Sequence, residues 1–155
     1  MDIKSSKQIL YKQSHVLLDD FVYLDECDPR ILIDLKYASC DNFVGRKIDG
    51  YKKNRAIIRL EVALALKQLQ DELLKKDFSL LIFDAYRPQR ASKMFHRWSM
   101  DSEDQMRKDI YYPNIDKNNL FKEGYISLTS QHSLGIAADL TICKKNSANN
   151  CFEPL

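Results

Sequence analysis

The sequence lacks a charge excess of either sign and lacks any long hydrophobic run, and both absences exclude classes of protein. Its 24 basic residues are opposed by 22 acidic ones, which gives a formal net charge of +2. A nearly balanced surface provides no footprint for nucleic acid or for an anionic membrane. No hydrophobic run approaches the roughly 20 residues that span a bilayer. Residues 1–14 are polar and lysine-bearing, without the apolar core of a signal peptide, so we expect a cytoplasmic protein.

Paired-cysteine motifs are also absent. The four cysteines, at positions 27, 40, 143 and 151, show no CxxC spacing and no secretory context. We therefore predict reduced thiols, with disulfides as the less favoured alternative. The chain also has no internal repeat, low-complexity tract or interdomain linker. Its 155 residues, 45% of them hydrophobic, are enough for one core, so we predict a single domain over residues 1–155.

Apolar spacing predicts alternating strands and helices. The clearest helix spans Arg55 to Lys76, and the uniformly apolar run that follows predicts a central strand covered on both faces. The complete set of expected elements is a strand or approach loop at 16–24, a strand at 31–37, a helix at 55–76, a strand at 78–83, a helix at 89–100 and a strand at 136–142. Two long irregular stretches separate them, at 38–51 and 101–119.

The segment SQHSLGIAAD at 130–139 places a histidine and a carboxylate seven residues apart. We predict a loop that delivers His132, a turn near Gly135, and a strand with its even-numbered apolar residues facing the core. His132 occupies an even-numbered position and Asp139 an odd-numbered one, so a regular strand would point them to opposite faces. A turn or bulge between them, which Gly135 permits, could bring them to one side. Converging imidazole and carboxylate groups suit a zinc ion with open positions for water and substrate. The alternative is a histidine with a purely structural role.

Arg87 lies where the buried strand gives way to the next helix, and Pro88 fits the first position of that helix. Two interpretations stay open. Arg87 pairs with Asp84 for structural reasons, or it is a rigidly held cation at the edge of a site, where it binds a substrate carboxylate or a developing oxyanion.

Three motifs occur in a fixed order: DLKYA with DNFxG at 34–45, DAYRP at 84–88, and SxHSxGxAxD at 130–139. In this combination the sequence resembles the D-alanyl-D-alanine dipeptidase family of zinc peptidases, from about Ile31 to the end. The resemblance implies that His132 and Asp139 are zinc ligands and that Arg87 stabilises the tetrahedral intermediate. It also implies that Ser130 contributes to the substrate pocket.

The resemblance implies a small α+β domain with a mostly antiparallel sheet and helices packed against it. It implies one Zn²⁺ per chain and hydrolysis of D-Ala-D-Ala, or a related dipeptide, by metal-activated water. Zinc lowers the pKa of bound water toward ~7 and polarises the scissile carbonyl, which is the chemistry that such a reaction needs.

The sequence departs from the family pattern after residue 139. The family has a third zinc ligand and a general base in a Glu-x-x-His segment, whereas no histidine follows Asp139 here and the sequence stops at Leu155. We therefore expect a C-terminally truncated domain whose sheet lacks a strand. Three functions follow: an inactive remnant, a dipeptidase completed by a separate C-terminal polypeptide or a neighbouring subunit, and a non-catalytic domain that binds D-amino-acid peptides. Completion from a neighbouring subunit requires that His15 or His96 can reach the site.

Overall fold

The computed structural model describes residues 20–146 and 151–154. The largest sheet within them has four strands. Its strand order is β2 (Leu32–Ile33), β4 (Phe78–Asp84), β5 (Asp139–Lys145) and β6 (Phe152–Pro154). Only β2 and β4 run parallel, and the other neighbours are antiparallel. A separate antiparallel pair joins β1 (Phe21–Tyr23) to β3 (Ile57–Arg59).

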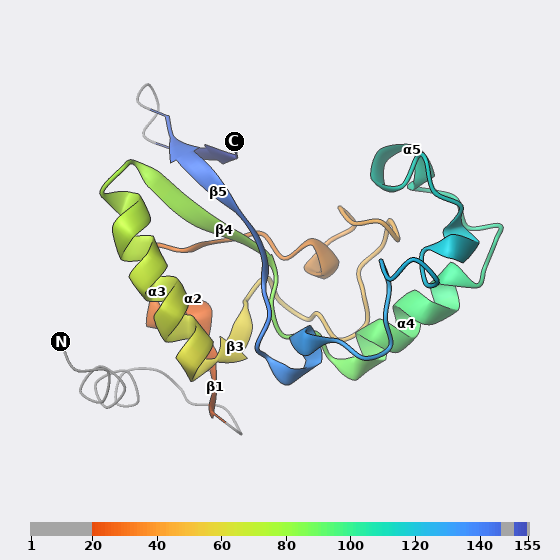
Figure 1. Ribbon diagram of the computed structural model, residues 1–155, viewed down its shortest axis with the longest axis horizontal. Coiled ribbons are helices and arrows are strands. Elements are labelled where there is room, and N and C mark those ends of the chain that lie inside the picture. Colours follow the sequence, from red (N-terminus) through yellow and green to blue (C-terminus); the bar gives the residue numbers. More distant parts are fainter. Residues whose placement is uncertain (1–19, 147–150, 155) are drawn as a thin grey trace.

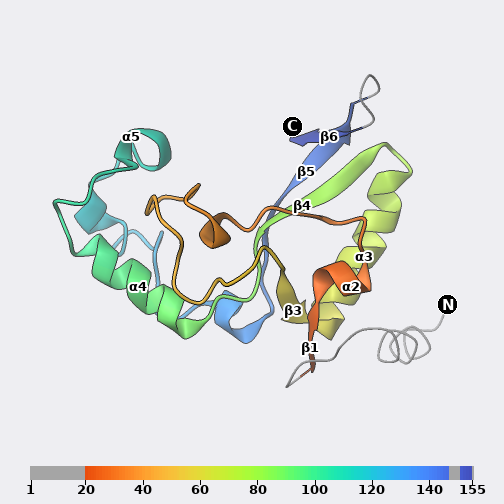
Figure 2. The ribbon, with the colours of Figure 1, turned by 180° about the vertical axis from the view of Figure 1, so that it is seen from behind.

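The helices lie on two sides of this sheet. Figure 1 shows α3 (Leu60–Leu74) beside β4, while α4 (Gln89–Ser99) and α5 (Lys108–Tyr111) lie beyond the opposite end of that strand. The view from behind shows the same separation, with α2 (Leu24–Cys27) next to α3 (Figure 2). Short 3₁₀ helices also lie within the described residues, namely η2 (Lys36–Ala38), η3 (Lys117–Asn119) and η4 (Gln131–Leu134). The predicted α+β class with a mostly antiparallel sheet is confirmed.

One apolar core joins α3 to the sheet, because the buried residues of that helix and of β4 belong to a single cluster. Leu80 and Ile82 are completely buried on β4. Gln70 is also completely buried and is satisfied at both ends of its amide. Its nitrogen donates to Ser79 Oγ at 2.9 Å and its oxygen accepts from the backbone nitrogen of Leu80 at 2.9 Å. These bonds fix the register of α3 on β4 without leaving a buried polar group unpaired.

The sequence prediction placed the start of the long helix too early. We expected a helix from Arg55, whereas Ile57 and Ile58 belong to β3 and pair with Tyr23 and Val22 of β1. Both isoleucines are β-branched, which favours a strand once a partner strand is available. The strands at 78–83 and the helix at 89–100 match β4 and α4 to within one residue at each end.

The strand predicted at 31–37 is also shorter than expected. It ends at Ile33, and the backbone nitrogen of Leu35 instead donates to the side-chain Oδ1 of Asn54 at 2.7 Å. The chain then turns into η2. At the N-terminus, β1 lies within the stretch 16–24 where we expected a strand or an approach loop, and residues 16–19 of that stretch lie outside the described residues.

The last long strand begins at Asp139, three residues later than predicted. Ile136 and Leu140, which we expected to face the core, are exposed. After β5 the chain forms the short edge strand β6, whose register covers only Cys143 to Lys145. On that side, the Asp139 end of β5 has no partner strand among residues 20–146 and 151–154.

Two further expectations concern disulfides and membrane-spanning helices. None of the four cysteines, all of them among the described residues, forms a disulfide, and Cys27 and Cys143 are buried. None of the helices in the described ranges is both long enough and apolar enough to cross a bilayer.

Gly135 provides a test of the packing between η4 and β1. Its φ is +71°, and a Cβ added there would lie 2.1 Å from Cε1 of Phe21. Gly124 is a matched control, since its φ is +82° but nothing lies within 4 Å of an added Cβ. We predict that Gly135→Ala lowers the free energy of unfolding by about 2–4 kcal/mol, and Gly124→Ala by only about 1 kcal/mol. Urea denaturation measures both, and equal losses would contradict the close contact.

Candidate metal centre

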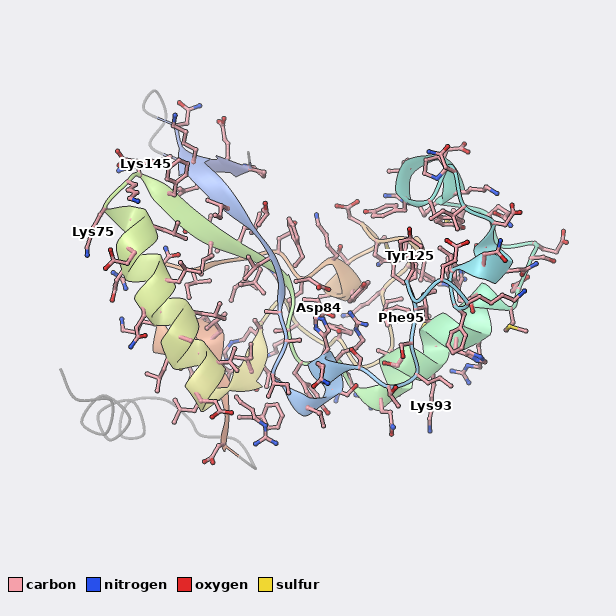
Figure 3. All side chains as sticks on the ribbon, viewed as in Figure 1. Lys75, Asp84, Lys93, Phe95, Tyr125 and Lys145 are labelled. Atoms are coloured by element: carbon pink, nitrogen blue, oxygen red, sulfur yellow. The ribbon has the colours of Figure 1, made fainter. Side chains whose placement is uncertain are left out.

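The predicted site residues meet where β4 ends, β5 begins and η4 packs between them. Asp84 is the last residue of β4 and is paired with Asp139, the first residue of β5. Figure 3 labels Asp84 at this meeting point, between the sheet and α4. His132 comes from η4, which ends at Gly135 in the left-handed conformation. The predicted turn at Gly135 thus brings His132 to the same side as Asp139, despite their different parity.

Backbone contacts fix the orientation of the His132 ring. Its Nδ1 lies 2.8 Å from the carbonyl oxygen of Ala85. Because a carbonyl only accepts, Nδ1 carries the hydrogen, and in the neutral ring Nε2 therefore keeps its lone pair. Nε2 lies 3.4 Å from Oδ1 of Asp139. Histidines that bind metals usually donate the hydrogen of their other ring nitrogen to a carbonyl or carboxylate, as His132 does here.

The spacing of these two atoms fits zinc. Two ligands at ordinary Zn–N and Zn–O distances, at a tetrahedral angle, lie about 3.3–3.4 Å apart. The observed separation of Nε2 and Oδ1 is 3.4 Å. Nitrogen and carboxylate oxygen are both common zinc donors. The Asp139 side chain is 55% exposed, so the centre is open to further ligands on that side.

Asp84 completes a cluster of three side chains that could hold a metal ion, but its oxygens are already engaged. The hydroxyl of Tyr51 donates to Oδ1 at 2.7 Å. Arg87 donates to Oδ2 through Nε at 3.0 Å and Nη2 at 2.7 Å. Oδ2 also faces the Nδ1 side of the His132 ring at 3.5 Å, away from the nitrogen that is free to bind metal. Asp84 therefore positions Arg87 and is not itself a ligand.

Arg87 makes the structural pair with Asp84 that the sequence suggested, while its binding of a substrate anion stays a prediction. It pairs with Asp84, and its Nη2 also lies 3.6 Å from Oδ2 of Asp139, so the guanidinium borders the centre. The side chain is only 13% exposed and lies over the rings of Tyr37 and Phe95, with its Cζ 5.4 and 5.5 Å from their centroids. These rings and the ion pair restrict the guanidinium to one orientation.

The backbone of Arg87 is tied to η4 in two places. Its nitrogen donates to the carbonyl of His132 at 3.1 Å, and its carbonyl accepts from Ser133 Oγ at 2.9 Å. The cation and the imidazole are therefore held in register by main-chain contacts as well as by side chains.

The charges of the site depend on burial and on these contacts. Burial raises the pKa of Asp84, which the adjacent Arg87 and Tyr51 partly offset. For His132, burial lowers the pKa, but the Asp139 carboxylate and the Ala85 carbonyl outweigh it, so the pKa lies above its ordinary value. The His132 contact holds the pKa of Asp139 below its usual range, against a smaller opposing effect of burial. Asp139 is thus ionised at neutral pH, and a metal ion would bind the His132 ring only after that ring lost a proton.

The other candidates lie at the edge of the centre or outside it. Ser130 caps η4, with its Oγ accepting from the backbone nitrogen of His132 at 3.3 Å. Cys143 pairs with Ser79, four residues or about 13 Å along β5 from Asp139, too far to join the centre. His96 lies on α4, with its ring centroid 4.8 Å from that of Phe121. His15 lies outside the described residues.

Sequence reasoning missed Tyr51 and the Ala85 carbonyl. Tyr51 belongs to the irregular stretch 38–51, and its contact with Asp84 spans 33 residues. The only signal in the sequence was that an aromatic residue ends a long loop, and loops of this length often line a site. A backbone carbonyl such as that of Ala85 has no residue signature.

Comparisons with known proteins agree with the motifs. A family profile described as D-ala-D-ala dipeptidase, Peptidase_M15, matches residues 18–151. A D-alanyl-D-alanine dipeptidase of Enterococcus faecalis is 43% identical over 122 residues, or 79% of this chain and 60% of that protein. One from Streptomyces coelicolor is 42% identical over 123 residues, or 79% of this chain and 61% of that protein. The D-alanyl-D-alanine dipeptidase of Escherichia coli is 31% identical over 114 residues, or 74% of this chain and 49% of that protein.

The chain spans about three fifths of the length of the E. faecalis and S. coelicolor relatives. The matched segment nevertheless includes every residue of the centre described above, from Tyr51 to Asp139. Because the profile covers most of the sequence, the chain belongs to the D-ala-D-ala dipeptidase family of M15 peptidases.

Proposed function

We propose that this chain supplies the zinc-binding and transition-state-binding part of a D-alanyl-D-alanine dipeptidase. The observation that carries the proposal is the pair of atoms, His132 Nε2 and Asp139 Oδ1, placed 3.4 Å apart beside the buried cation of Arg87. The dipeptidase activity for which the relatives are named supports the dipeptide substrate. The cytoplasmic location and the lack of a nucleic-acid partner stay predictions from the sequence.

Each side chain has a distinct proposed role. A bound zinc ion supplies Lewis-acid chemistry, by activating water and polarising the scissile carbonyl. His132 and Asp139 hold it, with the Ala85 carbonyl keeping the histidine in the correct tautomer. Arg87 directs its guanidinium at the oxygen of the scissile carbonyl, which becomes negative when water attacks. Such an interaction typically lowers the activation free energy by about 3 kcal/mol. Ser130, at the start of η4, contributes a hydroxyl to the substrate pocket.

Two protein ligands are fewer than catalytic zinc sites normally use, so the proposal includes a completing segment. The family pattern assigns the third ligand and the general base to a Glu-x-x-His segment, which we propose is supplied by a separate C-terminal polypeptide or by a neighbouring subunit. Three observations support docking next to Asp139. The ligand is half exposed, the β5 edge beside it is unpaired among the described residues, and apolar side chains are exposed around it. Those exposed side chains are Leu134, Ile136 and Leu140.

Two alternatives follow if no such segment joins the chain. A protein that binds D-Ala-D-Ala saturably without hydrolysing it is a peptide-binding domain. One that binds neither zinc nor dipeptide is an inactive remnant. Titration of the chain with zinc and, separately, with D-Ala-D-Ala distinguishes these outcomes.

The first test of the proposal is zinc affinity. We predict that His132→Ala weakens zinc binding at least 100-fold, because the variant loses one of two ligands. His96→Ala is the matched control for a centre within one chain, since the His96 ring lies on α4 against Phe121. Competition with a chromophoric chelator measures both dissociation constants. Equal affinities of the two variants would show that zinc binds elsewhere.

The second test is the pH dependence of zinc affinity. The pKa of His132 is raised above 6.5, so its proton competes with zinc already near neutral pH. Below that pKa the zinc affinity should fall about tenfold per pH unit, because one proton must leave for each ion bound. Asp139 contributes nothing to this slope, because its pKa is lowered and it is already ionised. Chelator competition between pH 5 and 8 measures the slope, and a flat profile would exclude His132 as a ligand.

The third test is hydrolysis. The chain is mixed with a separate polypeptide that carries the remaining two fifths of the E. faecalis relative, and alanine release from D-Ala-D-Ala is measured. We predict that Arg87→Lys lowers kcat about 10²–10³-fold with little change in KM, because a lysine loses the fixed bidentate contact to Asp84 and the aimed donor. Arg97→Lys on the exposed face of α4 should leave kcat unchanged. A larger effect on KM than on kcat would place Arg87 in substrate binding instead.

A further inference from the structure

A cavity of about 640 Å³ lies on another side of the β4–α4 junction. Its walls come from β3, from the end of the loop 38–51 and from the start of α4. His132, Asp139, Arg87 and Ser130 do not line it, so it is separate from the metal centre. One side chain is common to both, because Tyr51 lines the cavity and also donates to Asp84.

The charged residues that line this cavity are all basic: Lys52, Lys53, Arg55 and Arg90. Nearby acids neutralise two of them. Arg55 is held by Asp25 and Glu26, and Arg90 lies 3.8 Å from Asp49.

Lys52 and Lys53 are exposed and have no acidic partner within the part of the chain that the structure describes. The cavity therefore keeps a local excess of positive charge, although the sequence as a whole is nearly balanced. Clustered cations at a concave, partly desolvated surface attract an anion more strongly than isolated ones do.

The N-terminus of α4 adds to this positive potential. Gln89 and Arg90, the first two residues of this 11-residue helix, line the cavity. No side chain caps the helix and its first turn contains no acidic residue. Free backbone N–H groups and the helix dipole favour a bound anion at such an end. An arginine in the first turn is unfavourable for the helix alone, and an anion in the cavity would offset that cost.

The rest of the lining is aromatic and apolar. Tyr23, Tyr51 and Tyr86 contribute rings, and Leu35 and Ile57 contribute aliphatic surface. Tyr86 is braced by an edge contact with Phe21, with ring centroids 5.2 Å apart. Walls of this kind, with a few convergent charges, are typical of sites for small organic ligands.

We propose that this cavity is a second ligand site, which binds a small phosphorylated compound that carries a ring. The phosphate contacts Lys52, Lys53 and the α4 N-terminus, and the ring packs against the tyrosines. This site does not depend on zinc or on dipeptide hydrolysis.

The test is a calorimetric titration of the metal-free chain, kept in chelator, with phenyl phosphate as the probe. We predict saturable one-to-one binding that is at least tenfold tighter than that of inorganic phosphate. The variant Lys52→Gln/Lys53→Gln should lose at least tenfold in affinity for phenyl phosphate. The matched control is Lys75→Gln/Lys76→Gln, which removes the same charge at the far end of α3, about 22 Å along the helix from its start.

The control variant should bind phenyl phosphate as the unchanged chain does. Equal losses in both variants would reduce the interaction to nonspecific charge attraction and overturn the proposal. Equal affinity for inorganic phosphate and phenyl phosphate would overturn the role of the ring. Unchanged binding in Lys52→Gln/Lys53→Gln, or no saturable binding at all, would overturn the site itself. Because zinc and dipeptide are absent, each of these results is independent of the hydrolytic function.

Discussion

The buried ion pair between Asp84 and Arg87 is the constraint on which the metal centre depends. Asp84 is 1% exposed and Arg87 is 13% exposed, so both groups lose most of their hydration. Such a pair persists only if its remaining hydrogen-bonding groups are satisfied. Tyr51 satisfies the second oxygen of Asp84, and the rings of Tyr37 and Phe95 enclose the guanidinium. The interactions that hold Arg87 therefore come from η2, the loop 38–51, the end of β4 and α4.

How much of this fold could be predicted depends on where each segment finds its partners. β4 and α4 were predicted because a uniformly apolar run and a helical apolar stripe are properties of the segment itself. The start of α3 was wrong because Ile57 and Ile58 fit a helical stripe equally well until β1 pairs with them. The start of β5 was wrong for a related reason. Ile136 is apolar, yet it precedes the strand and remains exposed, which alternation alone does not reveal.

For the candidate site too, the chemical groups could be predicted from the sequence, whereas the contacts that orient them could not. His132, Asp139 and Arg87 lie in short segments whose residue types already indicate the chemistry, and the structure places them together. What the sequence could not provide is the set of contacts that orient them. The Ala85 carbonyl that fixes the His132 tautomer is a backbone group, and Tyr51 is 33 residues from its partner Asp84. Such contacts exist only after the loop, the strand end and η4 are packed together.

The residues of the candidate metal centre differ in how firmly the fold holds them. His132 and Arg87 are fixed by buried contacts before any ion binds, whereas Asp139 is 55% exposed at the unpaired end of β5. Any segment that packs on this edge would desolvate Asp139 and strengthen its attraction for a cation. Ion binding and docking would then stabilise each other, because each favours the same ordered arrangement of Asp139. The open edge of β5 is therefore as much a part of the proposed site as the two proposed ligands, His132 and Asp139.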